Sequence, residues 1–124
     1  MIEPSVVFTF DSSLQRTEGG EVIQDWVIPK DLPYFDGHFP GDPIFPAIAI
    51  IDGSLELLNR IKTTDSFSLD RLKSAKFLNV IQPGMQVRIT AKSYDGLRWD
   101  VLWTNGEPPS LLAELSFTLL RLSH

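Results

Sequence analysis

Apolar and polar residues alternate with a period of two over much of the chain, and this alternation predicts β-strands. The predicted strands, in chain order, span residues 6–10, 21–28, 67–81, 85–92, 97–104 and 111–120. Segment 67–81 alternates poorly, so we expect a bulge or a bend within it. Turn sequences such as Gln82-Pro83-Gly84 and Asn105-Gly106 separate the later strands, and short turns of this kind favour antiparallel pairing.

Residues 47–62 have the helical period instead. Pro46 suits the first position of a helix, because its missing N–H needs no partner there. An apolar stripe follows at helical spacing, at Ile48, Ile51, Leu55, Leu58 and Ile61. Further apolar side chains fill much of the remaining surface, at Ala49, Ile50 and Leu57. This helix is therefore apolar nearly all round at its start and should be buried in a core or at a subunit contact. Gly53 in its interior suggests a close backbone approach.

A loop rich in proline and glycine, residues 29–46, precedes the helix and is predicted to contain neither helix nor central strand. The order is thus strand, strand, rigid loop, long helix and four further strands. That order predicts an α+β fold in which an antiparallel sheet packs on one central helix. With 124 residues, we expect a single domain over residues 1–124.

Composition narrows the classes of partner. The net charge is −5 and no run of Lys or Arg occurs, so we expect neither nucleic acid nor an anionic membrane surface as a partner. There is no cysteine, which excludes disulfides, thiolate nucleophiles and cysteine-ligated metals. No signal peptide and no apolar run of transmembrane length is visible, so we expect a soluble, cytoplasmic protein. No metal and no cofactor is expected.

Two histidines are present, and His124 is the last residue, where a solvated side chain is the simplest interpretation. His38 lies in the rigid loop and is a candidate general base or acid, because its ordinary pKa lies near neutral. A role in hydrogen bonding the loop is the alternative. Asp52 stands within the apolar part of the helix, so its carboxyl group is paired, solvated in a cavity or protonated, unless it faces solvent. Glu56 follows one helical turn later on the same face.

The run Gly37-His38-Phe39-Pro40-Gly41-Asp42-Pro43-Ile44-Phe45-Pro46 resembles the signature of the hot-dog-fold 3-hydroxyacyl-acyl-carrier-protein dehydratases. The resemblance extends through the helix and to Ala75-Lys76-Phe77 and the Pro-Gly turn. It implies a hot-dog fold, a long central helix wrapped by a curved antiparallel sheet. It also implies a lyase that dehydrates a 3-hydroxyacyl thioester to the trans-2-enoyl form in fatty-acid or related polyene biosynthesis.

The same resemblance implies roles for single residues. His38 matches the catalytic base that removes the C2 proton, and Asp52 matches the acid that protonates the leaving hydroxyl group. Substrate-binding or oxyanion-hole positions correspond to Phe39, Pro46, Ala47 and Ile48, with the Ala47 N–H at the thioester carbonyl. The implied partners are acyl carrier protein bearing a 3-hydroxyacyl chain and a second copy of this chain, or a heterodimer or higher oligomer.

Departures from the family pattern leave alternatives open. Ala47 replaces a usual glycine, and Glu56 replaces a glutamine that orients the acid, so Glu56 could share a proton with Asp52. Leu78-Asn79 replaces a basic pair that precedes the Pro-Gly turn. A non-catalytic subunit that pairs with another hot-dog chain is therefore a second hypothesis. A hot-dog acyl thioesterase is the third.

Overall fold

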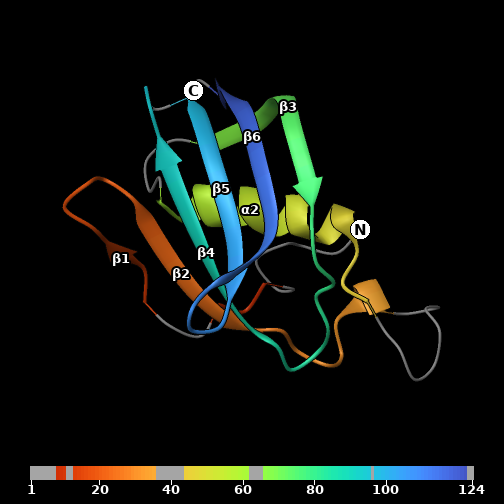
Figure 1. Ribbon diagram of the computed structural model, residues 1–124. Helices are drawn as coiled ribbons and strands as arrows, with labels where there is room; N and C mark the ends of the chain where they lie inside the picture. Colours follow the sequence, from red (N-terminus) through yellow and green to blue (C-terminus); the bar gives the residue numbers. More distant parts are fainter. Residues whose placement is uncertain (1–7, 11–12, 36–43, 62–65, 96, 123–124) are drawn as a thin grey trace.

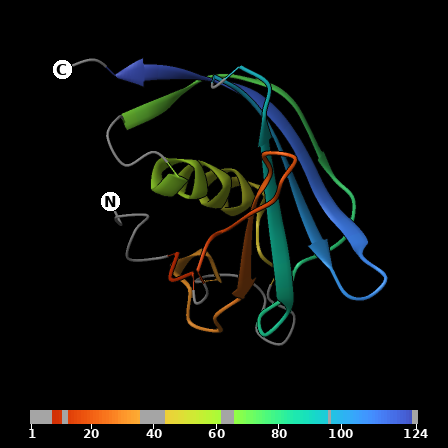
Figure 2. The same ribbon diagram turned by 90° about the vertical axis from the view of Figure 1, so that its left-hand side faces the viewer.

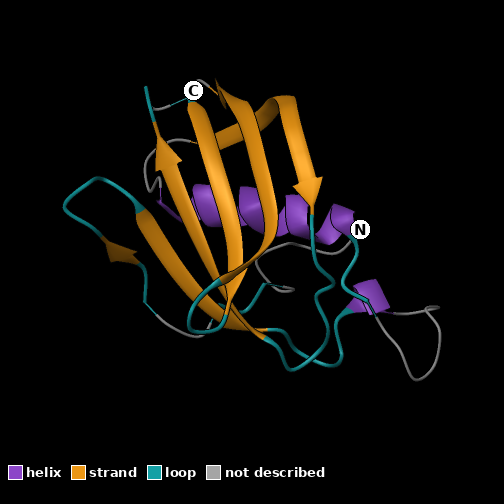
Figure 3. Ribbon diagram, viewed as in Figure 1, coloured by secondary structure: helices purple, strands orange, loops and turns teal. Residues whose placement is uncertain are grey.

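The computed structural model describes residues 8–10, 13–35, 44–61, 66–95 and 97–122. Its elements are β1 (Gln15–Arg16), β2 (Val22–Val27), the 3-10 helix η1 (Pro33–Phe35), α2 (Ala47–Ile61), β3 (Ser66–Phe77), β4 (Gln86–Ser93), β5 (Arg98–Asn105) and β6 (Ser110–Leu122). The predicted helix is confirmed within one residue, and η1 is a short addition inside the segment predicted as loop (Figure 3). No helix in these described ranges is long and apolar enough to cross a membrane.

The six strands form one antiparallel sheet in the order β1-β2-β4-β5-β6-β3 (Figure 1). The sheet curves around α2, which lies along its concave face (Figure 2). Hairpins join β4, β5 and β6 as their turn sequences predict. The expected α+β architecture is therefore confirmed, but β3 does not pair with β4, which follows it in the chain. It pairs with β6 and forms one edge of the sheet.

Alternation along the strands builds the core. In β2, Val22 and Trp26 are almost fully buried, whereas Val27 is 45% exposed. The inner face of β5 is likewise buried at Trp99, Val101 and Trp103. Because successive side chains of a strand point to opposite faces, one face of the sheet packs on α2 and the other meets solvent.

Strand β3 contains the irregularity that its poor alternation predicts. Its pairing with β6 shifts register between Leu69 and Arg71 and again between Leu72 and Ser74. The strand ends at Phe77 instead of residue 81. Beyond it the chain turns toward the start of α2, where the Phe45 N–H donates to the Ile81 carbonyl oxygen at 2.8 Å.

The strand predicted over residues 6–10 is wrong for its described part, residues 8–10, which carry no ladder; the rest lies outside the described residues. Phe8 is nevertheless fully buried, and its ring contacts those of Phe10 and Trp26. Apolar burial at alternate positions thus occurs here without strand pairing. The first strand is β1, which pairs with β2 across the turn at residues 17–20.

The buried face of α2 also differs from the predicted stripe. The buried residues are Ala49, Ile50, Gly53, Ser54, Leu57, Leu58 and Ile61. Ile48 is 56% exposed, and Ile51 and Leu55 are only partly buried. The close approach expected at Gly53 is confirmed, because a Cβ atom there would lie 3.0 Å from Phe8 and 3.1 Å from Trp103. The helix therefore leaves part of its apolar surface uncovered at its first turn.

Candidate active site

Asp52 lies in the second turn of α2 and is half-buried. Its Oδ2 atom accepts a hydrogen bond from the Tyr34 hydroxyl group at 2.6 Å. A distance this short is at the strong end of the range for O–H···O hydrogen bonds. The carboxyl group within the apolar part of the helix is thus paired, which is one of the alternatives that the sequence leaves open.

Tyr34 belongs to η1 and is fixed by neighbouring aromatic rings. Its ring lies 5.9 Å from that of Phe8 and 6.0 Å from that of Phe45, the latter edge-on. Phe45 itself is buried. Burial, and then the hydrogen bond to the Asp52 carboxylate, raise the pKa of the Tyr34 phenol well above its ordinary value. Tyr34 therefore remains a hydrogen-bond donor at any physiological pH.

The start of α2 presents backbone donors near Asp52. The N–H groups of Ala49 and Ile50 both donate to the Pro46 carbonyl oxygen, at 3.0 and 3.2 Å. For the N–H groups of Ala47 and Ile48, the described residues supply no acceptor, and both residues are exposed. Unpaired donors at the positive end of a helix dipole can stabilise an oxyanion.

His38 and Phe39 lie outside the described residues. The segments on either side of their loop are fixed to the helix and the sheet. On one side, Tyr34 is bonded to α2 through Asp52. On the other, the backbone bond from Phe45 to Ile81 attaches the loop to the segment that follows β3. These contacts hold the described residues on either side of segment 36–43.

Glu56, for which a proton shared with Asp52 was one alternative, is paired with Arg60. Its Oε2 atom accepts from the Arg60 guanidinium at 2.7 Å, and its side chain is only 11% exposed. Arg60 also donates to the Phe8 carbonyl oxygen at 2.6 Å and lies over the Phe10 ring. The pair therefore connects the N-terminal segment to α2. Its i,i+4 spacing is a signal that the sequence already contained.

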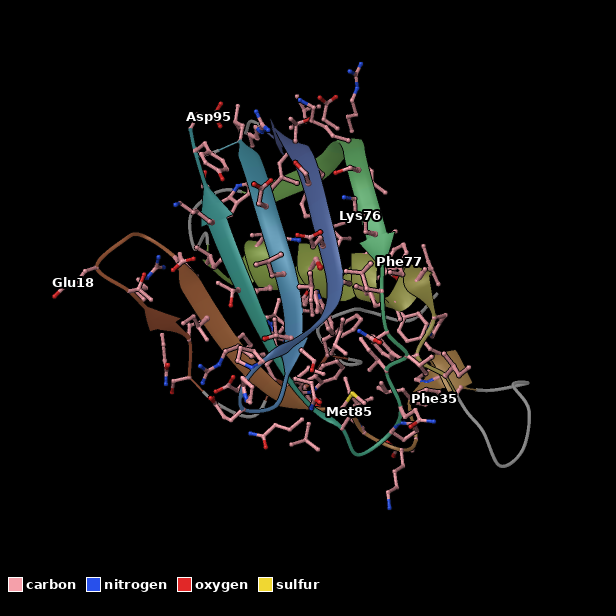
Figure 4. The ribbon with its side chains drawn as sticks, viewed as in Figure 1. Glu18, Phe35, Lys76, Phe77, Met85 and Asp95 are labelled. Carbon is pink, nitrogen blue, oxygen red and sulfur yellow. The ribbon has the colours of Figure 1, made fainter. Side chains whose placement is uncertain are left out.

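Two exposed lysines, Lys73 and Lys76, lie on β3, which forms one edge of the sheet. Figure 4 shows Lys76 near the end of this strand. Phe77, also labelled there, ends the strand beside them. An open groove of about 520 Å³ occupies a different place, over β2, β4 and β5, and none of the predicted site residues lines it. The described residues contain no group of three or more His, Cys, Asp or Glu side chains suited to a metal ion.

Tyr34 is the site residue that reasoning from the sequence missed. It lies 18 positions before Asp52, and no periodicity relates the two residues. The available signal was weak: a phenol directly before a rigid loop that carries a histidine.

Known proteins of similar sequence include dehydratases. A family model described as "ApeI-like: ApeI dehydratase" matches residues 14–104. The 3-hydroxyacyl-[acyl-carrier-protein] dehydratase FabZ of Fusobacterium nucleatum is 30% identical over 95 residues, which cover 70% of this chain and 66% of that relative. Another FabZ, from Chloroflexus aggregans, is covered over 59% of its length. The chain thus spans about two thirds or less of these relatives.

Solved structures show the same fold at lower identity. The dehydratase heterocomplex ApeI:P from Xenorhabdus doucetiae superposes with a TM-score of 0.73 at 19% identity, covering 88% of this chain and 95% of that one. A thioesterase superfamily member from Thermus thermophilus superposes with a TM-score of 0.59 at 18% identity, covering 87% and 85%. These likenesses confirm the predicted hot-dog fold.

Proposed function

Because the chain belongs to the ApeI-like dehydratase family, we propose that it dehydrates a 3-hydroxyacyl thioester on acyl carrier protein to the trans-2-enoyl thioester. One observation carries the proposal. A half-buried carboxyl group, Asp52, is held by a hydrogen bond in the second turn of a helix whose first N–H groups are unpaired among the described residues. Directly before that helix, the sequence carries the His38 motif.

The proposed reaction divides the work among three kinds of group. Neutral His38 takes the proton from C2 of the substrate, and the N–H groups of Ala47 and Ile48 stabilise the negative charge that develops on the thioester oxygen. Asp52 gives its proton to the C3 hydroxyl group, the C3–O bond breaks and water leaves. The C2–C3 double bond forms, and a proton returns from His38 to Asp52 through solvent. Phe39 and Pro46 are proposed to border the substrate.

We further propose that the active form is a dimer of hot-dog chains. An exposed apolar patch, called here the α2–β3 patch, consists of Ile44, Ile48, Phe77, Leu78 and Val80. These residues are 40–56% exposed, and the patch adjoins the unpaired edge of β3. A strand edge twelve residues long beside apolar side chains is a ready surface for pairing with another chain.

A charged substitution in the α2–β3 patch tests whether the chain forms this dimer. Phe77→Asp should convert the dimer to monomer, because an ionised group would be desolvated at the contact. Val27→Asp is the matched control, since Val27 is equally exposed, at 45% against 44%, but lies on β2, near the opposite edge of the sheet. Sedimentation velocity measures both variants. A monomeric wild type, or an equal effect of the two substitutions, would contradict the proposal.

Lys73 and Lys76 are proposed to dock the carrier protein, which is acidic in this family. Both are exposed on β3, the edge strand that contacts α2. Replacing both by Glu should raise KM for the carrier-bound substrate while leaving KM for a short thioester mimic unchanged, because the mimic lacks the protein surface. An equal change of KM for both substrates would contradict this role.

The activity is tested with a purified chain, a 3-hydroxyacyl carrier protein and its N-acetylcysteamine thioester. Mass spectrometry should show the loss of water and the enoyl product. His38→Ala should abolish turnover, and His124→Ala, the matched control, should leave it unchanged. Turnover that survives His38→Ala would refute the mechanism. Release of free thiol would instead favour a thioesterase, and turnover only with a second hot-dog chain would favour a subunit of a heterodimer.

A further inference from the structure

The hydrogen bond between Tyr34 and Asp52 leads to a second role at the site. We propose that Tyr34 is a positioning residue, whose hydroxyl group holds the Asp52 carboxyl group in one orientation and stabilises the charge it acquires on giving up its proton. This inference rests on the proposed function, in which Asp52 is the acid. The Tyr34–Asp52 bond links η1 to α2.

The orientation is set before a substrate arrives. The Tyr34 ring contacts the rings of Phe8 and Phe45, both of which are buried. Its hydroxyl group therefore points from a fixed ring to one carboxylate oxygen. A donor that is already oriented adds no reorganisation cost during the reaction.

The hydrogen bond from Tyr34 also gives the two carboxyl oxygens of Asp52 different roles. Oδ2 accepts from Tyr34, which leaves Oδ1 to carry the proton for the substrate. When that proton passes to the C3 hydroxyl group and water departs, negative charge spreads over both oxygens of Asp52. The Tyr34 bond then becomes a bond to an ion and strengthens. Tyr34 keeps its own proton throughout, so the step remains balanced.

The acidic residues near Tyr34 and Asp52 in the sequence do not bind Asp52 in place of Tyr34. Glu56, the acidic residue one turn further along α2, is paired with Arg60. Asp25, the acidic residue of β2, is paired with Arg88. Asp31, which precedes η1 by two residues, is exposed. Among the described residues, Tyr34 is the hydrogen-bond partner of Asp52.

Tyr34→Phe tests the inference, because it keeps the ring in contact with its aromatic neighbours and removes only the hydroxyl group. We expect kcat for the short thioester to fall about tenfold, the loss typical of a hydrogen bond to a charged group. KM should change by less than about twofold, because Tyr34 acts on Asp52 and not on the substrate.

The matched control is Tyr94→Phe. Tyr94 also hydrogen-bonds an aspartate, Asp100, but it is 61% exposed at the end of β4. This variant should keep the kcat of the wild type. In the Asp52→Asn background, Tyr34→Phe should cause no further loss of residual turnover, because the charge it stabilises no longer forms.

The outcomes separate this inference from the proposed function. If the wild type turns over and His38→Ala does not, the function stands. An unchanged kcat in Tyr34→Phe would then overturn the role of Tyr34 alone. An equal loss in the wild-type and Asp52→Asn backgrounds would also overturn it, since it would show a merely structural effect. A wild type without dehydratase turnover would overturn both.

Discussion

Ser54 and Trp103 form a buried hydrogen bond that fixes α2 to the sheet, and its removal is the sharpest test of the packing. The Trp103 indole N–H donates to Ser54 Oγ at 2.9 Å, and Ser54 in turn donates to the Ile50 carbonyl oxygen at 2.8 Å. Both side chains are fully buried. Ser54→Ala would leave the indole N–H without this acceptor in a place that water does not reach.

The expected cost follows from two opposing effects. An unsatisfied buried donor costs about 1–3 kcal/mol. Alanine is the better helix former by about 0.5 kcal/mol, which offsets part of that cost. The net loss in the free energy of unfolding is therefore about 1–2 kcal/mol. For a domain of this size that corresponds to a fall in Tm of about 4–8 °C.

Urea unfolding followed by circular dichroism measures the change, at one fixed protein concentration because association affects stability. The matched control is the same substitution in a Trp103→Phe background. The indole N–H is absent there, so Ser54→Ala should be nearly neutral or slightly stabilising.

Two results would refute the reasoning. A Ser54→Ala variant as stable as the wild type would show that the indole N–H finds another partner or water. The same cost in both backgrounds would show that the effect arises from the cavity or the helix and not from the hydrogen bond. If Ser54→Ala lowers stability only when Trp103 is present, the result would support the hydrogen bond between Trp103 and Ser54.

Three further substitutions test local features. Arg88 hydrogen-bonds Asp25 and lowers the pKa of that carboxyl group below the ordinary 3.8. This exposed pair therefore stabilises the fold above pH 3.8. The stabilisation is lost as the pH falls through the pKa of Asp25 in the folded state. Asp25→Asn should therefore lower the free energy of unfolding, measured in urea, by up to about 1 kcal/mol at pH 7 and leave it unchanged near pH 2. A loss of stability that persists in acid would contradict this. Glu56→Gln should weaken the pairing with Arg60 and lower the unfolding free energy by up to about 1 kcal/mol, with a smaller effect in 1 M salt; an effect independent of salt would point to lost packing. Gly84 has φ +83° with open space around it, so Gly84→Ala should cost about 1 kcal/mol through backbone strain alone, and an unchanged Tm would refute that.

Features set by local sequence were predictable. Pro46 and the long apolar run gave α2 to within one residue, because helix boundaries depend on neighbouring residues. The alternation over residues 21–28 gave β2 for the same reason. The bulged character of β3 was visible as poor alternation, and the motif at 37–46 together with Asp52 gave the family.

Features that depend on contacts between residues distant in sequence were not predictable from the sequence. A helix that is apolar nearly all round has no single preferred face, so only packing against the sheet decided that Ile50 is buried and Ile48 exposed. Residues 8–10 show strand-like alternation, yet a strand also needs a partner backbone, and Gln15–Arg16 pairs with β2 instead.

The sequence by itself thus determined most of the elements, the family and Asp52 as the proposed acid, because these depend on residue type and spacing along the chain. Only the tertiary structure decided what Asp52 contacts. In the fold, η1 lies against α2, and the Tyr34 hydroxyl group is 2.6 Å from Asp52 Oδ2. Glu56 instead forms an ion pair with Arg60. Hydrogen bonds act over a few ångströms in space, and separation in sequence does not reveal which groups come that close.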